Sequence, residues 1–433
     1  MPLRRASTNR EKVVDFQNRQ LHRLIRHAYH CVPHYRSLFD RNGIHPGDIR
    51  GLEDLETIPL TAKADLRNRS LKDIFSRSTR PERLVKRKTS GSSGMPFAIF
   101  RAPLEDHLIN LFRIQAYREY GMRVQDRSVV IAEIPAAGNA RRILSRCKEA
   151  FGIYRTCLID CYSEEDQIVA ELERIRPDIV IGYPSVLALL GARLCREGRE
   201  RIRPRLVVTG GGVLTADMRR RIEEGFVCPL FDVYGAHEFN ILAYECPQHG
   251  GAYHVCDTNV ILEILKDGRP AARGETGEVV ATGLHTLAMP FIRYRTGDVA
   301  TRGDAACACG HPFQTISHIQ GRTIDYFQLA ETRLVHPYTI TAPLVKEENA
   351  WICQHQLVQE AENHVVLRIQ PFHPPRSQDI ERLRRLGQER VGPGARFSVE
   401  LVKSFVHEPG KKFPPYVRRI EKNDSSGMER MHK

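Results

Sequence analysis

The sequence contains no long apolar segment. No stretch approaches the roughly 20 apolar residues that a membrane-spanning helix needs. The opening residues, MPLRRASTNREK, also lack the apolar core of a signal peptide. We therefore expect a cytoplasmic protein that has no membrane partner.

The sequence also lacks a concentrated basic block and an internal repeat. Its 65 lysines and arginines outnumber its 52 acidic residues, which gives a net charge of +13, but the arginines are dispersed and not interleaved with aromatic residues. A nucleic-acid partner is therefore not expected, and the charge suits an enzyme that handles anionic nucleotides. Apolar residues at 41% indicate a globular protein, and 433 residues favour one large domain with a smaller one.

Helical and strand patterns alternate through the first part of the chain. Residues 10–39 have helical apolar spacing with a proline break, and LEDHLINLFRIQAYREYG predicts a second amphipathic helix. Further strands and helices alternate after these two helices; the strands are predicted in RSVVIAEIP, RPDIVIG, RPRLVVTGGG and FVCPLFDVYG. This alternation predicts a mainly parallel sheet covered by helices, with ligands bound at the strand ends.

The later part of the chain changes character. NVILEIL, GEVVATGL and FIRYRTGDVATRG predict the short strands of a smaller β-rich unit. Beyond Asp325, two strand patterns flank the helical segment SQDIERLRRLGQERVG, which predicts a compact α+β domain. We therefore predict an α/β fold with a large domain over residues 1–325 and a small mobile one over residues 326–433, which ends in a disordered tail.

A glycine- and serine-rich segment, KTSGSSGMPF, occupies residues 88–97. Successive Gly and Ser residues let backbone N–H groups converge on a phosphate, and the hydroxyl groups add donors. A Walker loop needs a lysine directly after its second glycine, where this sequence has Met95, so a P-loop nucleoside triphosphatase is not expected. Taken alone, the segment is equally compatible with a plain flexible loop.

Four further segments follow this loop in a fixed order: YGAHE at 234–238, YRTGD at 294–298, GRTID at 321–325 and PGKK at 409–412. Together with TSGSSGMP, the series resembles the motifs of the adenylate-forming enzymes, and in detail their phenylacetate-CoA ligase branch. The segments GYPSVL and AMPFIRYRTGD, and the N-terminal segment that begins VPHYRSLFDRNG, extend the resemblance to nearly the whole chain.

The resemblance implies a nucleotide site. The β- and γ-phosphates of ATP would be held by Lys88, Thr89, Ser90, Gly91, Ser92, Ser93 and Gly94. Tyr234 and Gly235 would line the adenine and acyl pocket, with Asp232, Gly210, Gly211 and Gly212 at the purine. Asp298 would accept from both ribose hydroxyls, and Arg322 would contact the ribose or a phosphate, because a carboxylate accepts two donors and a guanidinium is a forked donor.

The resemblance also implies which residues carry the chemistry. Glu238 would hold Mg²⁺, which neutralises charge on the departing pyrophosphate. A lysine of the small domain, Lys411 or its neighbour Lys412, would reach the acyl phosphate before that domain swings about a hinge at Asp325. His237 stands where the family has a hydroxyl residue, and it would donate to the α-phosphate or reach the acyl carboxylate.

The eleven cysteines include a second constellation. ECPQHGG presents Cys246 and His249 at metal-ligand spacing, and ACACGHP presents Cys307 and Cys309. Two such turns suit a structural zinc site with four protein ligands, and some members of the same branch resemble this arrangement. His254 is an alternative to His249, Cys256 or His311 could take part, and reduced buried thiols are the alternative to a metal site.

These features predict a ligase that activates a carboxylic acid with ATP and Mg²⁺ through an acyl adenylate. The apolar segments 131–137 and 183–187 favour an aryl or arylacetic acid. Coenzyme A is the acceptor that the family implies, while a carrier-protein thiol, an amine and a homodimer stay open. The alternatives are a nucleotidyltransferase of the same fold, which would transfer AMP to a hydroxyl or phosphate, and a zinc-stabilised binding protein without catalysis.

Overall fold

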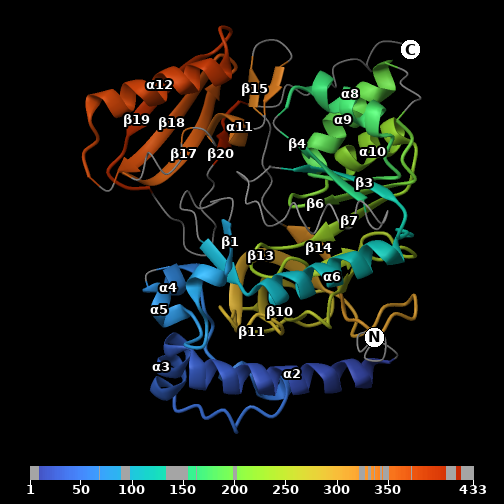
Figure 1. The fold of residues 1–433 in the computed structure, drawn as a ribbon, viewed down its shortest axis with the longest axis vertical. Coiled ribbons are helices and arrows are strands. Elements are labelled where there is room, and N and C mark those ends of the chain that lie inside the picture. The colour runs from blue at the N-terminus through green and yellow to red at the C-terminus, as the bar shows by residue number, and fades with distance from the viewer. Residues whose placement is uncertain are drawn as a thin grey trace, which may run out of the picture. The chain divides into compact units, whose positions relative to one another are not determined.

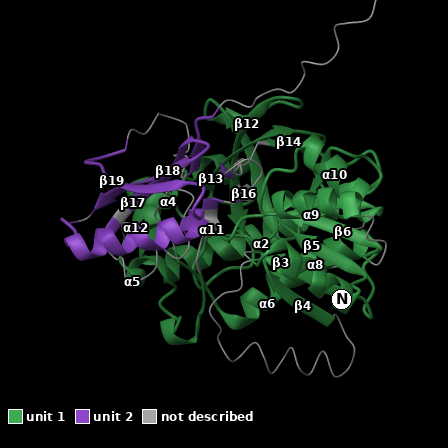
Figure 2. Ribbon diagram, turned by 90° about the horizontal axis from the view of Figure 1, so that it is seen from above, with its two compact units in different colours: residues 1–87, 98–322 green, residues 88–97, 323–433 purple. Residues whose placement is uncertain are grey.

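The computed structural model describes residues 9–67, 69–88, 98–132, 155–161, 163–197, 202–320, 327–329, 333–335, 337–341, 344, 351–371, 373–405 and 416–420. The chain divides into two compact units, residues 1–87 with 98–322 and residues 88–97 with 323–433 (Figure 2). Both units combine helices and sheets, so the predicted mixed α/β class is confirmed. Asp325, the predicted boundary, lies outside the described residues.

A twelve-stranded sheet forms the centre of the first unit (Figure 1). In the order in which they lie side by side, its strands are β11 (Arg269–Pro270), β10 (Val260–Lys266), β12 (Thr276–Gly283), β13 (Tyr294–Arg302), β14 (Thr315–Gln320), β9 (Ala252–Val255), β8 (Ala243–Glu245), β7 (Leu230–Tyr234), β6 (Leu206–Gly210), β5 (Ile179–Gly182), β3 (Arg127–Ala132) and β4 (Arg155–Asp160).

This sheet has a parallel half and an antiparallel half. The strands β4, β3, β5, β6 and β7 are parallel, as the alternation of helices and strands predicts. At β7 the direction changes, because β8 pairs with it antiparallel through Val233 and Tyr244, and antiparallel pairing continues to β11. The strands predicted as a smaller β-rich unit are therefore the antiparallel half of the same sheet.

Helices cover both faces of the parallel half. The helices α8 (Glu165–Ile175), α9 (Pro184–Glu197) and α10 (Ala216–Phe226) bury one face, which includes Val180 and Val207. The helix α6 (Pro103–Glu119) buries the opposite face, to which the neighbouring residues Ile179 and Leu206 belong. Because successive strand residues point to opposite faces, most positions in the inner strands β5, β6 and β7 are apolar.

Two N-terminal helices pack against the antiparallel half. The helix α2 (Arg10–Cys31) begins after Asn9, whose side chain accepts from the Lys12 N–H, and α3 (Pro33–Arg41) begins at the predicted proline break. A stripe of α2 that includes Leu21 and Ala28 is fully buried in a cluster with Ile261 of β10. No helix in the described ranges is long and apolar enough to cross a bilayer.

Short elements connect these helices to α6. They are η1 (Leu52–Thr57), α4 (Lys63–Arg67), α5 (Leu71–Ile74), η2 (Pro81–Arg83) and a two-stranded sheet of β1 (Val85–Lys88) and β2 (Ala98–Arg101). The segment 89–97 between β1 and β2 contains the predicted phosphate loop and lies outside the described residues.

The second unit contains a four-stranded sheet of β19 (Arg396–Leu401), β18 (His364–Pro371), β17 (Ile352–Ala361) and β20 (Tyr416–Arg418) in that order. The helix α12 (Ser377–Val391) buries Leu383 and Val391 in one core with these strands, as predicted. A short pair, β15 (Phe327–Leu329) and β16 (Arg333–Val335), and the helix α11 (Pro337–Thr341) contribute to the same core.

Candidate active site and metal-binding cluster

Two glycine-containing segments follow neighbouring parallel strands. Gly210 ends β6 and pairs with Val233 of β7. Gly211 and Gly212 therefore follow β6 at the same level of the sheet at which Tyr234 ends β7 and Gly235 follows it. Gly211 has φ +78°, and a Cβ there would lie 2.8 Å from the Tyr183 ring. Parallel α/β sheets bind ligands at the carboxyl ends of their strands, so these segments lie where a ligand site is expected.

The segments YGAHE and YRTGD are joined by two reciprocal hydrogen bonds. The Tyr234 hydroxyl donates to Oδ2 of Asp298 over 2.9 Å, and the Tyr294 hydroxyl donates to Oε1 of Glu238 over 2.9 Å. The first residue of each segment thus holds the last residue of the other. The two predicted carboxylates, one for ribose and one for Mg²⁺, are therefore linked across the sheet, Glu238 in the turn after β7 and Asp298 in β13.

Burial makes these tyrosines reliable donors. Burial, followed by the charge of Asp298, raises the pKa of Tyr234 well above its usual value. Tyr294 is almost fully buried and its ring packs edge-on against Phe291. Both carboxylates therefore have a fixed partner at one oxygen, and Asp298 itself is only half-buried.

Gly235 permits a tight turn between Tyr234 and Glu238. A Cβ at this position would lie 2.3 Å from the carbonyl oxygen of Asn240. Asn240 itself has φ +67°, a conformation that asparagine tolerates better than most residues. The turn leaves His237 exposed, whereas Glu238 is buried.

Asp232 is a buried residue of β7 and makes only internal contacts among the described residues. Its carboxylate accepts from the hydroxyls of Thr209, over 2.5 Å, and Tyr253, over 2.9 Å, and its N–H donates to Glu245 over 3.0 Å. Burial raises the pKa of Asp232 to about 6. Its carboxylate thus ties β6, β7 and β9 together, and a contact with a purine stays a prediction.

Three of the predicted zinc ligands meet in the structure. Cys246, Cys307 and Cys309 have ligand atoms within 4.8 Å of one another and of a histidine, and that histidine is His254. His249 was predicted in this place, but it lies exposed in the turn between β8 and β9. Since Tyr244 pairs with His254 across this hairpin, Cys246 and His254 share one face of it. The structure thus brings His254, the alternative named from the sequence, and not His249, to the three cysteines.

The spacing of this cluster, defined as Cys246, His254, Cys307 and Cys309, fits a tetrahedral ion. The sulfurs of Cys246 and Cys307 are 3.8 Å apart, and Nε2 of His254 is 3.3 Å from Sγ of Cys309. A zinc ion with Zn–S bonds of about 2.3 Å would separate two sulfurs by about 3.8 Å. The N–H groups of Gln248 and His311 approach the sulfurs of Cys246 and Cys309, each over 3.4 Å.

Comparison with known proteins supports the resemblance that the sequence motifs indicate. No family model matches the chain. The phenylacetate-coenzyme A ligase of Thermus thermophilus is 27% identical over 357 residues, which cover 78% of this chain and 76% of that protein. The phenylacetate-coenzyme A ligase of Escherichia coli is 28% identical over 371 residues, 80% of this chain and 79% of the other. The resemblance to phenylacetate-CoA ligases that the sequence motifs indicate is therefore confirmed.

Solved structures agree in fold with this chain. A 2-hydroxyisobutyryl-CoA ligase, solved with 2-HIB-AMP and CoA in its thioesterification state, superimposes with a TM-score of 0.64 at 21% identity. The match covers 96% of this chain and 91% of the ligase. The curated relatives confirm the predicted enzyme class, an AMP-forming acid ligase that uses ATP.

Several predicted site residues fall beyond the described ranges. Lys88 ends β1, whereas Thr89, Ser90, Gly91, Ser92, Ser93, Gly94, Arg322 and Lys411 lie outside the described residues. Two residues that sequence reasoning did not single out, Tyr294 and Tyr253, contact predicted site residues. Tyr294 is the first residue of the YRTGD motif, and this position is the sequence signal that points to it.

Proposed function

We propose that this protein activates a carboxylic acid with ATP to form an acyl adenylate and then transfers the acyl group to a thiol, with coenzyme A as the acceptor. The single observation that carries this proposal is the reciprocal pairing of Tyr234 with Asp298 and of Tyr294 with Glu238. It brings together one carboxylate suited to ribose hydroxyls and another suited to a divalent cation.

In this proposal, each described site residue has one task. Asp298 accepts hydrogen bonds from the ribose and keeps its orientation through Tyr234. Glu238 is the carboxylate that would hold Mg²⁺, which supplies neutralisation of phosphate charge when bound. The carboxylate of the acid attacks the α-phosphorus, the bond to pyrophosphate breaks, and the electron pair leaves with pyrophosphate. A thiol then attacks the acyl carbon and AMP leaves.

Other predicted residues enter the proposal on the resemblance alone. Lys411 would place its cation on the transferring group during adenylation, and Asp325 would be the hinge for the second step. The serine-rich segment 89–94 would hold the outer phosphates.

An aryl or arylacetic acid is the proposed substrate class. Tyr183, half-buried and packed over Gly211, is the described aromatic residue that supports it at the strand ends. Ile131 and Leu187, from the two segments predicted to line the pocket, are instead fully buried in the core under α8, α9 and α10. The curated phenylacetate ligases support the same class.

We also propose that the Cys246, His254, Cys307 and Cys309 cluster holds a structural zinc ion. Four protein ligands fill a tetrahedral shell and leave no position for a catalytic water. Three of the four side chains are buried, and Cys309 is half-buried. The ion would fix the β8–β9 hairpin to the loop that carries Cys307 and Cys309.

Exchange of labelled pyrophosphate into ATP, measured over a panel of aryl, arylacetic and aliphatic acids, tests the proposed function. We expect exchange with at least one aryl or arylacetic acid, strong loss of exchange in Glu238→Gln, and a CoA thioester by mass spectrometry when CoA is added. Absence of exchange with every acid would refute acid activation. AMP attached covalently to a hydroxyl or phosphate product would identify a nucleotidyltransferase instead.

A further inference from the structure

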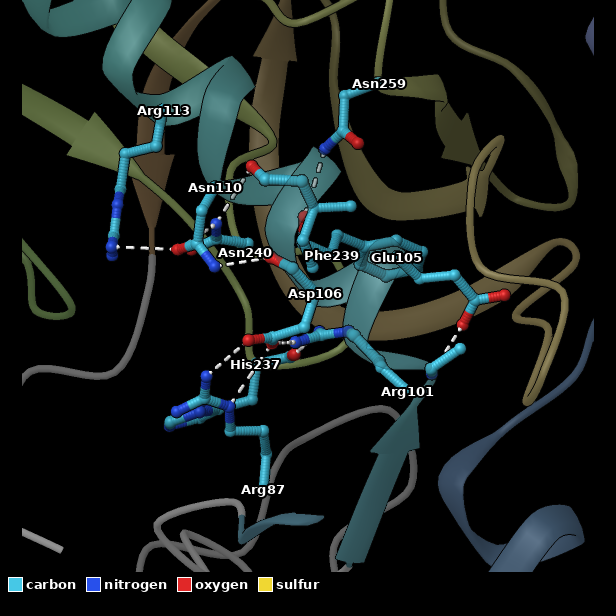
Figure 3. A network of polar contacts seen from close by, with 12 residues as sticks. Arg87, Arg101, Glu105, Asp106, Asn110, Arg113, His237, Phe239, Asn240 and Asn259 are labelled. Carbon is cyan, nitrogen blue, oxygen red and sulfur yellow. Dashed lines mark hydrogen bonds and ion pairs between the residues drawn. The ribbon is translucent and has the colours of Figure 1, made fainter. Parts of the chain in front are cut away.

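A buried arginine contacts the turn that carries His237 and Glu238 (Figure 3). Arg101 is the last residue of β2 and only 4% of it is exposed. Its guanidinium donates a hydrogen bond to the backbone carbonyl oxygen of His237. The atom that it holds therefore belongs to the peptide unit that directly precedes Glu238.

Asp106 connects Arg101 to a second arginine. Asp106 lies in the first turn of α6, and its Oδ1 is 3.4 Å from Nη1 of Arg101. Its Oδ2 accepts a hydrogen bond from Nη2 of Arg87 over 2.7 Å. Arg87 belongs to β1, so the carboxylate lies between two cations from the two strands of one ribbon (Figure 3).

The far end of the same turn is held by α6 and by the antiparallel half of the sheet. Asn240 donates through Nδ2 to the carbonyl oxygen of Ile109 over 3.0 Å. Asn259 donates to the carbonyl oxygens of Phe239, over 3.0 Å, and Ile241, over 2.8 Å. These contacts hold the residues after Glu238, and Arg101 holds the peptide unit directly before it.

Packing alone does not explain an arginine at this position. Burial lowers the pKa of the Arg101 guanidinium, and the nearby Asp106 opposes that effect. Nε of Arg101 has no hydrogen-bond partner among the described residues. A buried ion pair often stabilises a fold no more than apolar residues of similar size do. We therefore expect Arg101 to contribute by orienting the His237 carbonyl group and not by stabilising the fold.

We propose that Arg101 is a positioning residue for adenylation, which holds the His237 carbonyl and thereby aims the Glu238 carboxylate at its cation. The proposal rests on the proposed function. Glu238 is then held at two points. Arg101 holds the main chain before it, and the Tyr294 hydroxyl donates to Oε1 of its carboxylate. Loss of Arg101 frees the peptide unit before Glu238 and leaves the rest of the site intact.

Substitutions of Arg101 in the full-length protein test this role. Pyrophosphate exchange is measured against Mg²⁺ concentration for the wild type, Arg101→Met and Arg101→Lys. Because small misplacements of reacting groups are costly, we expect Arg101→Met to lower the maximal rate roughly 100-fold. We also expect it to raise the half-saturating Mg²⁺ concentration roughly tenfold, as loss of a group that orients a metal ligand does. The KM for the acid should change little, and Arg101→Lys should recover part of both effects.

A matched control and a double-variant cycle separate positioning from structural support. Arg205→Met removes an arginine that pairs with the buried Asp126 over 2.7 Å, and it should change neither quantity. Arg101→Met added to Glu238→Gln should cost little beyond Glu238→Gln alone, because residues that act through one group are not additive. Full additivity with an unchanged Mg²⁺ requirement would overturn the proposal.

The result is separable from failure of the proposed function. Should the wild type show no exchange with any acid, acid activation fails, while Mg²⁺-dependent ATP binding by calorimetry still reports on the positioning role. Weaker Mg²⁺ dependence of binding in Arg101→Met than in wild type supports the role, and equal dependence refutes it. Should Arg101→Met fail to fold, Arg101→Lys and Asp106→Asn carry the same comparison.

Discussion

The hydroxyl of Tyr234 donates a hydrogen bond to Oδ2 of Asp298 over 2.9 Å, although 64 residues separate them in the sequence. This contact joins β7 to β13, which are separated by three strands in the sheet. It fixes the rotamer of a carboxylate whose proposed task is to meet two ribose hydroxyls at once. The orientation of Asp298 is therefore set before a nucleotide arrives.

Tyr234→Phe should weaken nucleotide binding. A hydrogen bond to a charged group contributes about 1.5 kcal/mol, so removal of this hydroxyl should raise the KM for ATP roughly tenfold and change kcat less. Pyrophosphate exchange against ATP concentration measures the effect. Tyr35→Phe is the control, since Tyr35 also loses a buried hydroxyl that donates to a carbonyl, that of Pro290. An equal rise in both variants would contradict the role of Tyr234.

Tyr294→Phe should change the metal requirement instead. The Tyr294 hydroxyl donates a hydrogen bond to Oε1 of Glu238. Loss of a partner that orients a metal ligand typically lowers metal affinity about 10–100-fold. We expect the half-saturating Mg²⁺ concentration to rise about tenfold at saturating ATP. Tyr234→Phe should leave this concentration unchanged, and an equal shift in both variants would count against the assignment.

Histidine substitutions should distinguish the two candidate zinc ligands. Zinc content of protein purified without chelators is expected near one per chain in the wild type and in His249→Ala. In His254→Ala it should fall, and the melting temperature should fall with it, because binding to the native state is part of its stability. A wild type that contains no zinc would retire the metal site, and loss of zinc in His249→Ala alone would restore the ligand set predicted from sequence.

Substitution of Arg293 should destabilise the first unit strongly. Arg293 pairs with Glu263 over 2.7 Å with both side chains largely buried, and it also donates to the carbonyl oxygens of Glu56 and Ile58. Removing one partner of a buried pair costs about 3–5 kcal/mol, so Arg293→Met should lower the free energy of unfolding by about that amount. Denaturant unfolding measures this loss.

The control for Arg293 lies two residues away in the chain. Arg295 pairs with Glu278 over 2.7 Å but is half-exposed. Arg295→Met should therefore cost less than about 1 kcal/mol. An equal decrease in the free energy of unfolding in the two variants would show that burial does not make the Arg293–Glu263 pair more important for stability than the exposed pair.

The pH dependence of stability should reveal Asp232. Because burial raises its pKa to about 6, the folded state favours the protonated carboxyl, whose contribution is fully present below the unfolded pKa of 3.8 and lost as the pH rises through 6. Relative to Asp232→Asn, the wild type should thus lose up to about 3 kcal/mol across this interval. Unfolding curves of the two proteins that stay parallel between these pH values would contradict the raised pKa.

Local patterns in the sequence predicted the elements that depend on local periodicity. The break at Pro33, the helix of residues 103–119 and the α+β pattern around α12 were all predicted, because burial of one helix face leaves a regular spacing. The continuity of the sheet from β7 to β8 was not predicted, since strand pairing depends on residues distant in the chain.

The site was predictable in residue type but not in contacts. Motif order singled out Glu238 and Asp298, but a linear motif does not say that Tyr294 holds one and Tyr234 the other. Ligand spacing predicted a histidine near Cys246. The choice between His249 and His254 depends on the pairing of β8 with β9, which decides which side chains lie on the same face as Cys246. Arg101 carries no motif at all, and its importance follows only from its burial and its contact with the turn.

Alternate residues of the hairpin of β8 and β9 contact two different groups, the buried Asp232 and the cysteine cluster. Glu245 and Tyr253 face Asp232, while the residues that follow them in the chain, Cys246 and His254, belong to the cysteine cluster. A strand shifted by one position exchanges its faces, so a single insertion or deletion in β9 would turn tyrosine toward the thiols and histidine toward the buried carboxyl. We infer that this hairpin tolerates replacement of side chains far better than any change in its length.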